Sequence, residues 1–425
     1  MSLFTALSSG TAGLASAGSD ISAVGDNLAN SNTIGFKQQR VNFADALAQN
    51  VVGASGQIGL GSRMQSVQTI MTEGALQNTG IATDLALQGN GFFQVSGTTR
   101  DGRNGLFLTR AGQFTVDNNG FLVTQDGLRV QGYAADAAGN VTVALGDLQV
   151  GNATATPHPT VDIAIKANLD ADAPTGVWDP TQPAASSNFS TSVSVYDSLG
   201  HATQIQIYFR HTTTGWEWHG MADGAAVGGT PGTPVEVAGG TLAFDAAGRL
   251  QTVTQSSSFN PAGANAPQPL TFDLGDALDD GGTGLAGITQ FASPGATTLV
   301  TQDGYGSGQL SAVQIDKSGV VQGVFTNGEM RSLGQVGVAR VAAPDALERT
   351  GGNLYAVTSG SGDAVMGAAG EGGRAFIAAG TLEQSNVDIA DQLVRMITAQ
   401  RIYEANSKTI TTADQLLSEL ISMKR

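Results

Sequence analysis

The chain has 425 residues, enough for more than one domain, and 41% of them are hydrophobic, enough for real cores. It contains 58 glycines and 13% charged residues, whereas an average protein has about 7% glycine and roughly 25% charged residues, so we expect many turns and little helix in the middle. The absence of cysteine excludes thiolate metal sites and cysteine nucleophiles. A net charge of −16 opposes binding to nucleic acid or anionic lipid, so we expect neither as a partner.

The N-terminus lacks the features of a cleavable secretion signal. Its first basic residue is Lys37, and the apolar residues before it are periodic rather than continuous. The sequence has no run of about 18 apolar residues, so we expect no insertion into a membrane. The protein is therefore expected either to stay inside the cell or to leave by a route that needs no Sec-type signal.

Residues 3–28 predict a helix with a narrow seam of apolar or small residues. Glycines between the seam positions lower its helix propensity, so the helix is expected to be marginal alone and to need a partner. One alternative is a single amphipathic helix packed on a globular core. The seam consists of two sets at seven-residue spacing: Leu7, Leu14, Ile21 and Leu28, and Leu3, Gly10, Ala17 and Val24.

The chain after Gly380 predicts a second, longer helix with the same period. An apolar repeat of seven residues over four heptads is typical of a coiled coil. We therefore predict a terminal helical coiled-coil domain made of residues 1–30 and 383–425. The seam of the second helix is predicted at Ile389, Met396, Tyr403, Ile410 and Leu417, with Leu393 and Ile421 at the second seam position.

Between these ends the sequence changes character several times. Residues 31–73 are polar, rich in Gln and dotted with Gly, and we predict an extended linker. From Gly74 short alternating runs are separated by turn signals such as residues 117–120, which indicates antiparallel β structure. Similar turn chemistry resumes after residue 297. We therefore predict a discontinuous inner β domain made of residues 74–150 and 298–378.

The segment 151–297 has a different composition from its surroundings. It holds 11 of the 12 prolines, all three tryptophans and all four histidines, together with 13 acidic and 3 basic residues. Its apolar residues alternate, as at Val193 and Val195, and residues 197–200 make a turn signal. We predict a separate β-sandwich or small barrel inserted into the inner domain. The predicted fold is thus mainly β, with discontinuous nested domains and a terminal α-helical coiled coil.

The sequence offers little that could carry chemistry. A partial GxGxxG at residues 89–94 has Gln94 in its last position and no helix after it, so a dinucleotide site is not expected. Residues 117–120 lack the ligand spacing of a calcium loop and are better explained as a hairpin turn. Three histidines, His201, His211 and His219, are close enough in sequence for a metal, but in a β domain such residues more often lie on solvent faces. We predict no catalytic residue, no cofactor and no metal, and therefore no enzyme.

Two short segments carry distinctive residues. The one that follows the first helix contains Asn30, Thr33, Gly35, Phe36 and Lys37. The one that begins the second helix contains Asn386, Val387, Asp388, Gln400, Arg401, Tyr403, Glu404 and Asn406. These segments resemble the signatures of the flagellar axial family, the rod, hook and hook-associated subunits, and the second matches almost position for position. Ile402 departs mildly, because the family usually carries Ala there.

The inserted segment resembles the outer domain of flagellar hook proteins in particular. The stretch 195–201, followed by Tyr208, Phe209 and Trp216, carries this resemblance. The short rod proteins of the family lack such an insertion, so the resemblance favours a hook protein over a rod protein.

The resemblance implies a structural subunit that self-assembles into the bendable tubular hook, a universal joint that transmits motor torque to the filament and encloses the export channel. The implied partners are the chain itself in a helical homopolymer, the flagellar rod, the hook cap and hook–filament junction proteins, and the type III export apparatus. The implied location is the hook outside the cell. The alternatives are a distal rod subunit and a secreted β-rich adhesin.

Overall fold

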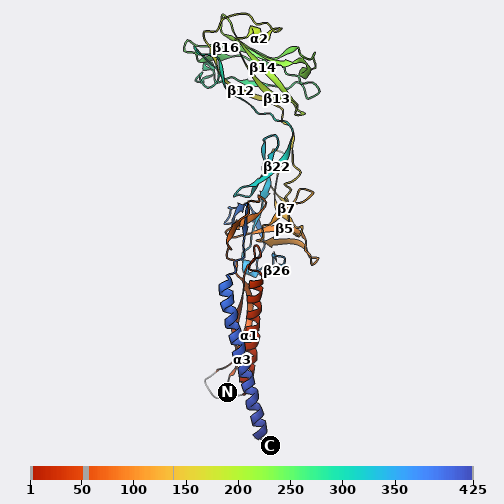
Figure 1. Ribbon diagram of the computed structural model, residues 1–425, viewed down its shortest axis with the longest axis vertical. Helices are drawn as coiled ribbons and strands as arrows, with labels where there is room; N and C mark the ends of the chain where they lie inside the picture. The colour runs from red at the N-terminus through yellow and green to blue at the C-terminus, as the bar shows by residue number, and fades with distance from the viewer. Residues whose placement is uncertain (1–2, 51–56, 137, 424–425) are drawn as a thin grey trace. The chain divides into compact units, whose positions relative to one another are not determined.

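The computed structural model describes residues 3–50, 57–136 and 138–423 (Figure 1). The chain forms two compact units: the first comprises Met1–Ala153, Ala312–Val324 and Met330–Arg425, and the second comprises Thr154–Ser311 and Phe325–Glu329. The fold is mainly β with long terminal helices, which confirms the predicted class. Within the described part of the chain, no helix is both long and apolar enough to cross a membrane.

The two ends of the chain form a pair of helices in the first unit. Helix α1 spans Leu3–Ala29 and helix α3 spans Ile389–Met423, and they lie side by side (Figure 1). Helix α3 starts where a side chain replaces the missing backbone acceptor: Asp388 Oδ1 accepts from the N–H of Ala390 at 2.8 Å. Both helices were predicted from the seven-residue period.

The segment predicted as an extended linker is instead folded over most of its length. Strands β1 (Gln39–Asn50) and β2 (Gln57–Thr69) pair as an antiparallel hairpin. The hairpin packs along α1, where the hydroxyls of Ser16 and Ser62 lie 2.9 Å apart and Val41 is buried. Its polar sequence hides this structure, because only one side of a hairpin that lies on a helix needs apolar residues.

The rest of the first unit is a β domain built from both halves of the chain. One sheet has the strand order β23-β24-β9-β5-β6-β27-β26, and two further pairs join β4 to β29 and β3 to β30. Strands before and after the insertion therefore complete one domain. Their bounds are β3 (Leu76–Asn78), β4 (Leu85–Gln88), β5 (Phe92–Thr98), β6 (Asn104–Thr109), β7 (Phe114–Val116), β8 (Leu122–Thr124), β9 (Arg129–Ala135), β10 (Val141–Asp147), β23 (Val320–Phe325), β24 (Met330–Val336), β25 (Val338–Arg340), β26 (Glu348–Gly351), β27 (Leu354–Ala356), β28 (Val365–Gly367), β29 (Phe376–Ala379) and β30 (Thr381–Glu383).

The core of this β domain follows from the alternation in its strands. Phe93 and Val95 of β5 are fully buried with Phe114 of β7, and the rings of Phe93 and Phe114 meet edge to face at 5.1 Å between centroids. The predicted turn at 117–120 is confirmed: the Asp117 carboxylate accepts from the N–H groups of Asn119 and Phe121, and Gly120 supplies φ +84°.

The second unit is a β-sandwich. A sheet with the order β13-β14-β15-β16-β17 packs against a sheet in which β12 pairs with β19, β20 and β21. Ile163 and Ile165 from one sheet meet Trp216 and Trp218 from the other in a single buried cluster. The elements are β11 (Thr154–Ala155), β12 (Asp162–Asp170), α2 (Pro183–Ser186), β13 (Phe189–Tyr196), β14 (Ala202–His211), β15 (Trp216–Asp223), β16 (Pro234–Phe244), β17 (Leu250–Val253), β18 (Ser256–Ser257), β19 (Thr271–Asp273), β20 (Thr289–Phe291), β21 (Ala296–Gln302) and β22 (Gly308–Ile315).

The second unit also takes in residues that the sequence assigned to the inner domain. Residues 298–311 cluster with the sandwich because β21 pairs antiparallel with β12, from Gln302 opposite Ile163 to Ala296 opposite Asn168. The composition of the sequence changes near residue 297, but strand β21 continues across this point and stays paired with β12. The boundary between the two units therefore cannot be read from composition.

The turn between β13 and β14 makes the second unit sensitive to acid. Asp197 is buried, and its Oδ1 accepts from the N–H groups of Leu199 at 2.8 Å and His201 at 2.9 Å. Burial alone would raise the pKa of Asp197, but the hydrogen bonds from His201 and Leu199 outweigh it and lower the pKa below the ordinary 3.8. The carboxylate therefore contributes stability that is complete above the unfolded-state pKa and is lost as pH falls through the folded-state pKa.

We expect Asp197→Asn to destabilise the second unit at pH 7 by about 1–2 kcal/mol, because hydrogen bonds to a neutral amide are weaker than those to a carboxylate. The deficit should shrink steadily as the pH falls below 3.8, because the wild-type carboxyl loses its charge. Urea unfolding followed by tryptophan fluorescence reports on this unit alone, since all three tryptophans lie in it. Asp279→Asn, an exposed residue, is the control, and an equal pH dependence in both variants would contradict the prediction.

Candidate functional site

The helix pair is closely packed because small residues of α1 leave room for side chains of α3. On α1, Gly10, Ala17 and Val24 are buried at seven-residue spacing, and a Cβ on Gly10 would lie 2.9 Å from Ile410 Cγ1. A Cβ on Gly13 would lie 2.6 Å from the side-chain amide of Asn406. The glycines that weaken α1 as an isolated helix are therefore the residues that let α3 approach.

The contact on α3 differs in part from the predicted seam. Met396, Ile410 and Leu417 are partly buried as the first seam set, but the second set is Ala399, Asn406 and Ala413, three residues after the first rather than four. Two alanines and an amide at these positions carry little hydrophobic signal, which is why the larger Leu393 and Ile421 were chosen from sequence.

The remaining predicted seam residues fall into three groups. Leu7, Leu14, Ile21 and Leu28 of α1 are partly buried. On α3, four residues keep large exposed fractions: Ile389 48%, Leu393 44%, Tyr403 45% and Ile421 68%. The side chain of Leu3 lies outside the described residues. The chain by itself therefore covers only one stripe of the second helix.

The first family segment turns the chain from α1 into the β domain. Thr33 Oγ1 donates to Asn30 Oδ1 at 3.1 Å. Phe36 is buried, and Arg349 Cζ lies over its ring, 5.0 Å from the ring centroid. Gly35 has φ +69°, and a Cβ there would lie 2.6 Å from the backbone N of Ala111. Only glycine meets both conditions.

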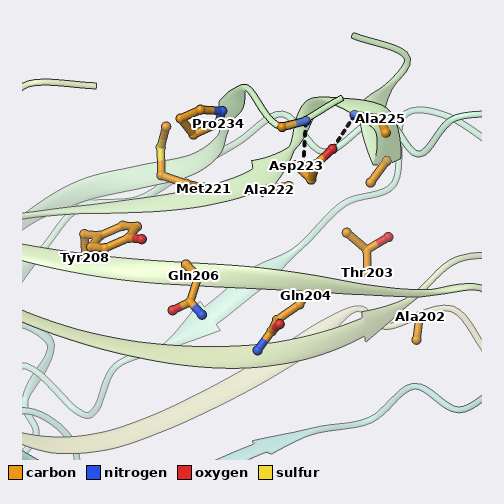
Figure 2. Close-up of a pocket in the computed structure, with 12 residues that line it drawn as sticks. Ala202, Thr203, Gln204, Gln206, Tyr208, Met221, Ala222, Asp223, Ala225 and Pro234 are labelled. Atoms are coloured by element: carbon orange, nitrogen blue, oxygen red, sulfur yellow. Dashed lines mark hydrogen bonds between the residues drawn. The ribbon is translucent and has the colours of Figure 1, made fainter. Parts of the chain in front are cut away.

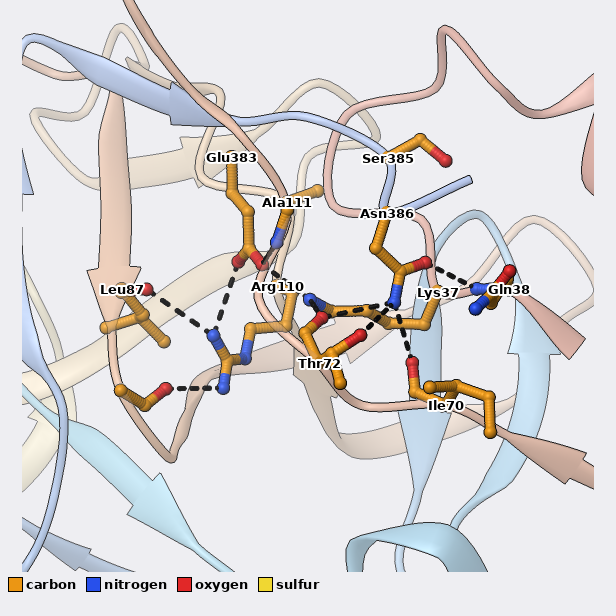
Figure 3. Close-up of polar contacts among 12 residues, drawn as sticks. Lys37, Gln38, Ile70, Thr72, Leu87, Arg110, Ala111, Glu383, Ser385 and Asn386 are labelled. Carbon is orange, nitrogen blue, oxygen red and sulfur yellow. Dashed lines mark hydrogen bonds and ion pairs between the residues drawn. The ribbon is translucent and has the colours of Figure 1, made fainter. Parts of the chain in front are cut away.

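Three charged side chains form a buried ion cluster where the two terminal segments meet the β domain (Figure 3). Lys37 Nζ lies 2.5 Å from Glu383 Oε1, and Arg110 Nη1 lies 3.3 Å from Glu383 Oε2. Both cations therefore donate to the same carboxylate. The three side chains are exposed by 0%, 0% and 4% for Glu383, Lys37 and Arg110. Residues far apart in the sequence are thus joined by charge inside the protein.

Backbone groups complete the coordination of this cluster. Lys37 Nζ also donates to the carbonyl of Thr72 at 2.6 Å, and the N–H of Gly74 donates to Glu383 Oε1 at 3.0 Å. Arg110 Nη2 donates to the carbonyl of Gly89 at 2.7 Å. Burial lowers the pKa of Lys37 from its ordinary value, and the neighbouring Glu383 carboxylate offsets part of that effect. Loss of either Lys37 or Glu383 would therefore leave the other charge buried without its partner.

The second family segment fastens the chain beside the cluster. Asn386 Oδ1 accepts from the N–H of Gln38 at 2.8 Å, and its Nδ2 donates to the carbonyls of Ile70 at 2.9 Å and Thr72 at 3.1 Å (Figure 3). Val387 is partly buried, and Asp388 caps α3. One asparagine therefore ties the start of α3 to the residue before β1 and to the residues that follow β2.

Other family residues lie on the open side of α3. Gln400, Arg401 and Glu404 are exposed. Sequence reasoning missed four residues of the junction, Arg110, Glu383, Asn27 and Gln392. Asn27 Nδ2 donates to Gln392 Oε1 at 3.1 Å, and both side chains are buried. The available signal was a charged or amide residue inside an apolar pattern, which a periodicity argument passes over.

The second unit holds a hollow on the outer face of its larger sheet. Gln204, Gln206 and Tyr208 of β14 line it together with Met221 of β15 (Figure 2). The only carboxylate in its lining, Asp223, already accepts from the N–H groups of Ala225 at 2.8 Å and Gly232 at 3.0 Å. The hollow therefore has no acid–base pair among its lining residues.

The three histidines considered as metal ligands, His201, His211 and His219, each contact different neighbours. His201 is held by Asp197 at 3.1 Å, His211 stacks on Trp216 at 4.8 Å between ring centroids, and His219 stacks on Trp178 at 4.2 Å. Each histidine is thus engaged by its own neighbours.

Comparison with known proteins places all of these parts in one family. A flagellar hook protein FlgE/F/G D1 domain model matches residues 86–170, a flagellar basal body protein FlaE D2 domain model matches 168–305, and a flagellar basal body rod FlgEFG protein C-terminal model matches 378–423. The chain is 35% identical to the flagellar hook protein FlgE of Borreliella burgdorferi, over 99% of this chain and 100% of that protein. It is 34% identical to that of Treponema pallidum over 100% of both, and 32% identical to that of Escherichia coli over 99% of this chain and 100% of that protein.

A helix pair made from the chain termini, a discontinuous β domain and an inserted sandwich define an axial structural subunit of the bacterial flagellum. The chain belongs to the flagellar hook protein family.

Proposed function

We propose that the chain polymerises into the bendable tubular hook and acts there as a universal joint between the basal body and the filament. The observation that carries this proposal is the unfilled apolar surface of α3. Ile389, Leu393 and Ile397 follow one another at four-residue spacing and are exposed by 48%, 44% and 52%. Residues four apart lie on one helix face, so a neighbouring copy can bury this row while α1 covers the other stripe.

Head-to-tail contacts of this kind build an open helical polymer rather than a closed ring. In this proposal the terminal helices line the export channel, and the two β units form the outer layers whose contacts reform as the tube bends. The exposed Gln400, Arg401 and Glu404 are available as polar contacts between neighbouring helices. Their place in the family signature supports that role.

We further propose the partners and the export route that family membership suggests. They are the flagellar rod, the hook cap and hook–filament junction proteins, and the type III export apparatus, with the assembled hook outside the cell. A distal rod subunit is the nearest alternative, and the match of the insertion to a hook-type outer domain argues against it.

Deletion of residues 1–30 or of residues 389–425 is expected to abolish polymerisation, because each removes one partner of the helix pair. The second cut begins after Glu383, so the ion cluster keeps its carboxylate. Sedimentation and electron microscopy measure the polymer, and circular dichroism with tryptophan fluorescence shows that the second unit stays folded. Curved tubes from the wild type and none from either deletion are the expected result. Normal tubes from either deletion, or straight rigid tubes from the wild type, would contradict the proposal.

A further inference from the structure

A small cavity of about 150 Å³ adjoins the buried ion cluster in the first unit. Backbone at Asn90 and Gly91, the ring of Phe92 and the loop after β25 form part of its wall. Two arginines line it as well: Arg110, a member of the ion cluster, and Arg340, the last residue of β25. The cavity is therefore lined by two arginines, one directly after β6 and one at the end of β25.

The wall of this cavity carries more positive charge than the described residues neutralise. Within the ion cluster, Lys37 and Arg110 share the single carboxylate of Glu383, so two cations and one anion leave a charge of +1. Arg340 enters no described ion pair, and its Nη1 donates to the carbonyl of Gly372 at 3.0 Å. The buried Nε of Arg110 has no hydrogen-bond partner among the described residues.

The nearby acidic residues do not cancel this charge. Asp345 follows Pro344 at the rim of the cavity, but its Oδ2 accepts from Gln68 Nε2 at 3.1 Å. Glu73 lies near Lys37, but it is exposed to solvent and enters no described ion pair. Arg110 is buried without full compensation, and Arg340 is exposed in the single chain and so is open to a partner, and both favour an anion with oxygen acceptors in the cavity.

We propose that this cavity is an anion site and that its occupant is a side-chain carboxylate of a second copy of the chain, an inference that rests on the proposed polymerisation. The guanidinium fork binds a planar carboxylate better than a point charge does. Each subunit carries a net charge of −16, so like charges repel wherever two copies meet. A positive cavity at such a contact lets one acidic side chain of the neighbour be neutralised and fixes the register between the two copies.

The test compares the critical concentration for polymerisation of full-length variants, measured by sedimentation. We expect Arg340→Gln to raise it by about tenfold or more, because truncating one partner of a desolvated charge pair weakens association strongly. Arg103→Gln is the matched control, since Arg103 lies in the same unit and makes only an exposed ion pair with Glu348 at 3.4 Å. The control is expected to change the critical concentration by about twofold at most.

A second variant guards against a folding defect in the first. Ala342→Asp places a carboxylate of the same subunit at the rim of the cavity, where Ala342 is exposed, and should block the neighbour's carboxylate without removing an arginine. Ala346→Asp adds the same charge at an exposed position outside the cavity lining. We expect a higher critical concentration for the first of these two variants than for the second. Equal values for the two, or for Arg340→Gln and its control, would overturn the proposal.

A third arm distinguishes the source of the anion. Calorimetric titration of unpolymerised protein with sodium sulfate and sodium acetate, at constant ionic strength, measures binding of free anions. Free-anion binding that Arg340→Gln abolishes, together with unchanged polymerisation, would assign the cavity to a small anion and overturn the second copy as occupant. A wild-type chain that forms no polymer would overturn both this inference and the proposed function. Normal wild-type polymer with an equally good Arg340→Gln polymer would overturn this inference alone.

Discussion

Replacing Glu383 by Gln is expected to lower the stability of the first unit by about 3–5 kcal/mol, because it leaves two buried cations without a counter-charge. The amide keeps the size and shape of the side chain, so the loss reflects charge rather than volume. Glu383 is fully buried and is the carboxylate partner of both Lys37 and Arg110. Urea unfolding followed by far-ultraviolet circular dichroism measures the change, and tryptophan fluorescence gives the second unit as an internal reference.

The matched control is Glu348→Gln, which removes the same charge from an exposed ion pair with Arg103. Exposed pairs contribute about 0–1 kcal/mol, so this variant should unfold close to the wild type. Adding Lys37→Met to Glu383→Gln should restore part of the lost stability, because it removes one of the two unpaired cations. Equal midpoints for Glu383→Gln and Glu348→Gln would show that the cluster does not stabilise the junction.

Replacing Ala399 by Asp is expected to abolish polymerisation. Ala399 is 2% exposed on the face of α3 that contacts α1, and a carboxylate there would lose its hydration. Burying this charge costs several kcal/mol, which is more than the packing of a marginal, glycine-rich α1 contributes to the helix pair. The two helices should therefore separate. Sedimentation measures the polymer, and circular dichroism measures the helix content that is lost.

Thr398→Asp tests whether position or charge matters. It adds the same carboxylate one residue earlier, where the side chain is exposed and has no proposed contact with a neighbouring copy. We expect it to polymerise nearly as well as the wild type. Equal failure of both variants would assign the effect to the open face of α3, and equal success would argue that the α1–α3 contact is dispensable.

Both helices and most strands were predictable because their signals are local. A seven-residue period over residues 3–28 and 389–421 defines a continuous stripe, and the structure has helices at Leu3–Ala29 and Ile389–Met423. Turn residues such as Gly120 and Gly200 adopt φ of +84° and +85°, a conformation that glycine adopts readily. The alternation of Val193 and Val195 likewise predicted a strand with one buried face, and these residues are 5% and 0% exposed.

The β1–β2 hairpin and the second seam set of α3 were not predictable in the same way. The hairpin owes its place to packing against α1, where Val41 is buried, rather than to a continuous apolar pattern in its own strands. On α3, Leu393 has the stronger apolar character but is 44% exposed, while Ala399 is buried at 2%. Which stripe of a helix becomes the seam depends on the surface that meets it, and the small residues of α1 select a small partner.

By itself, the sequence determined the two terminal helices, the β character of everything between them and the family to which they belong, because period, turn chemistry and short motifs act over a few residues. Only the tertiary structure decided that Lys37, Arg110 and Glu383 meet, since they lie 73 and 273 residues apart in the chain. It also decided that Asn386 ties the start of α3 to the hairpin. The physical reason is that a charge becomes important in this way only when folding removes it from water, and no local pattern shows which charges those are.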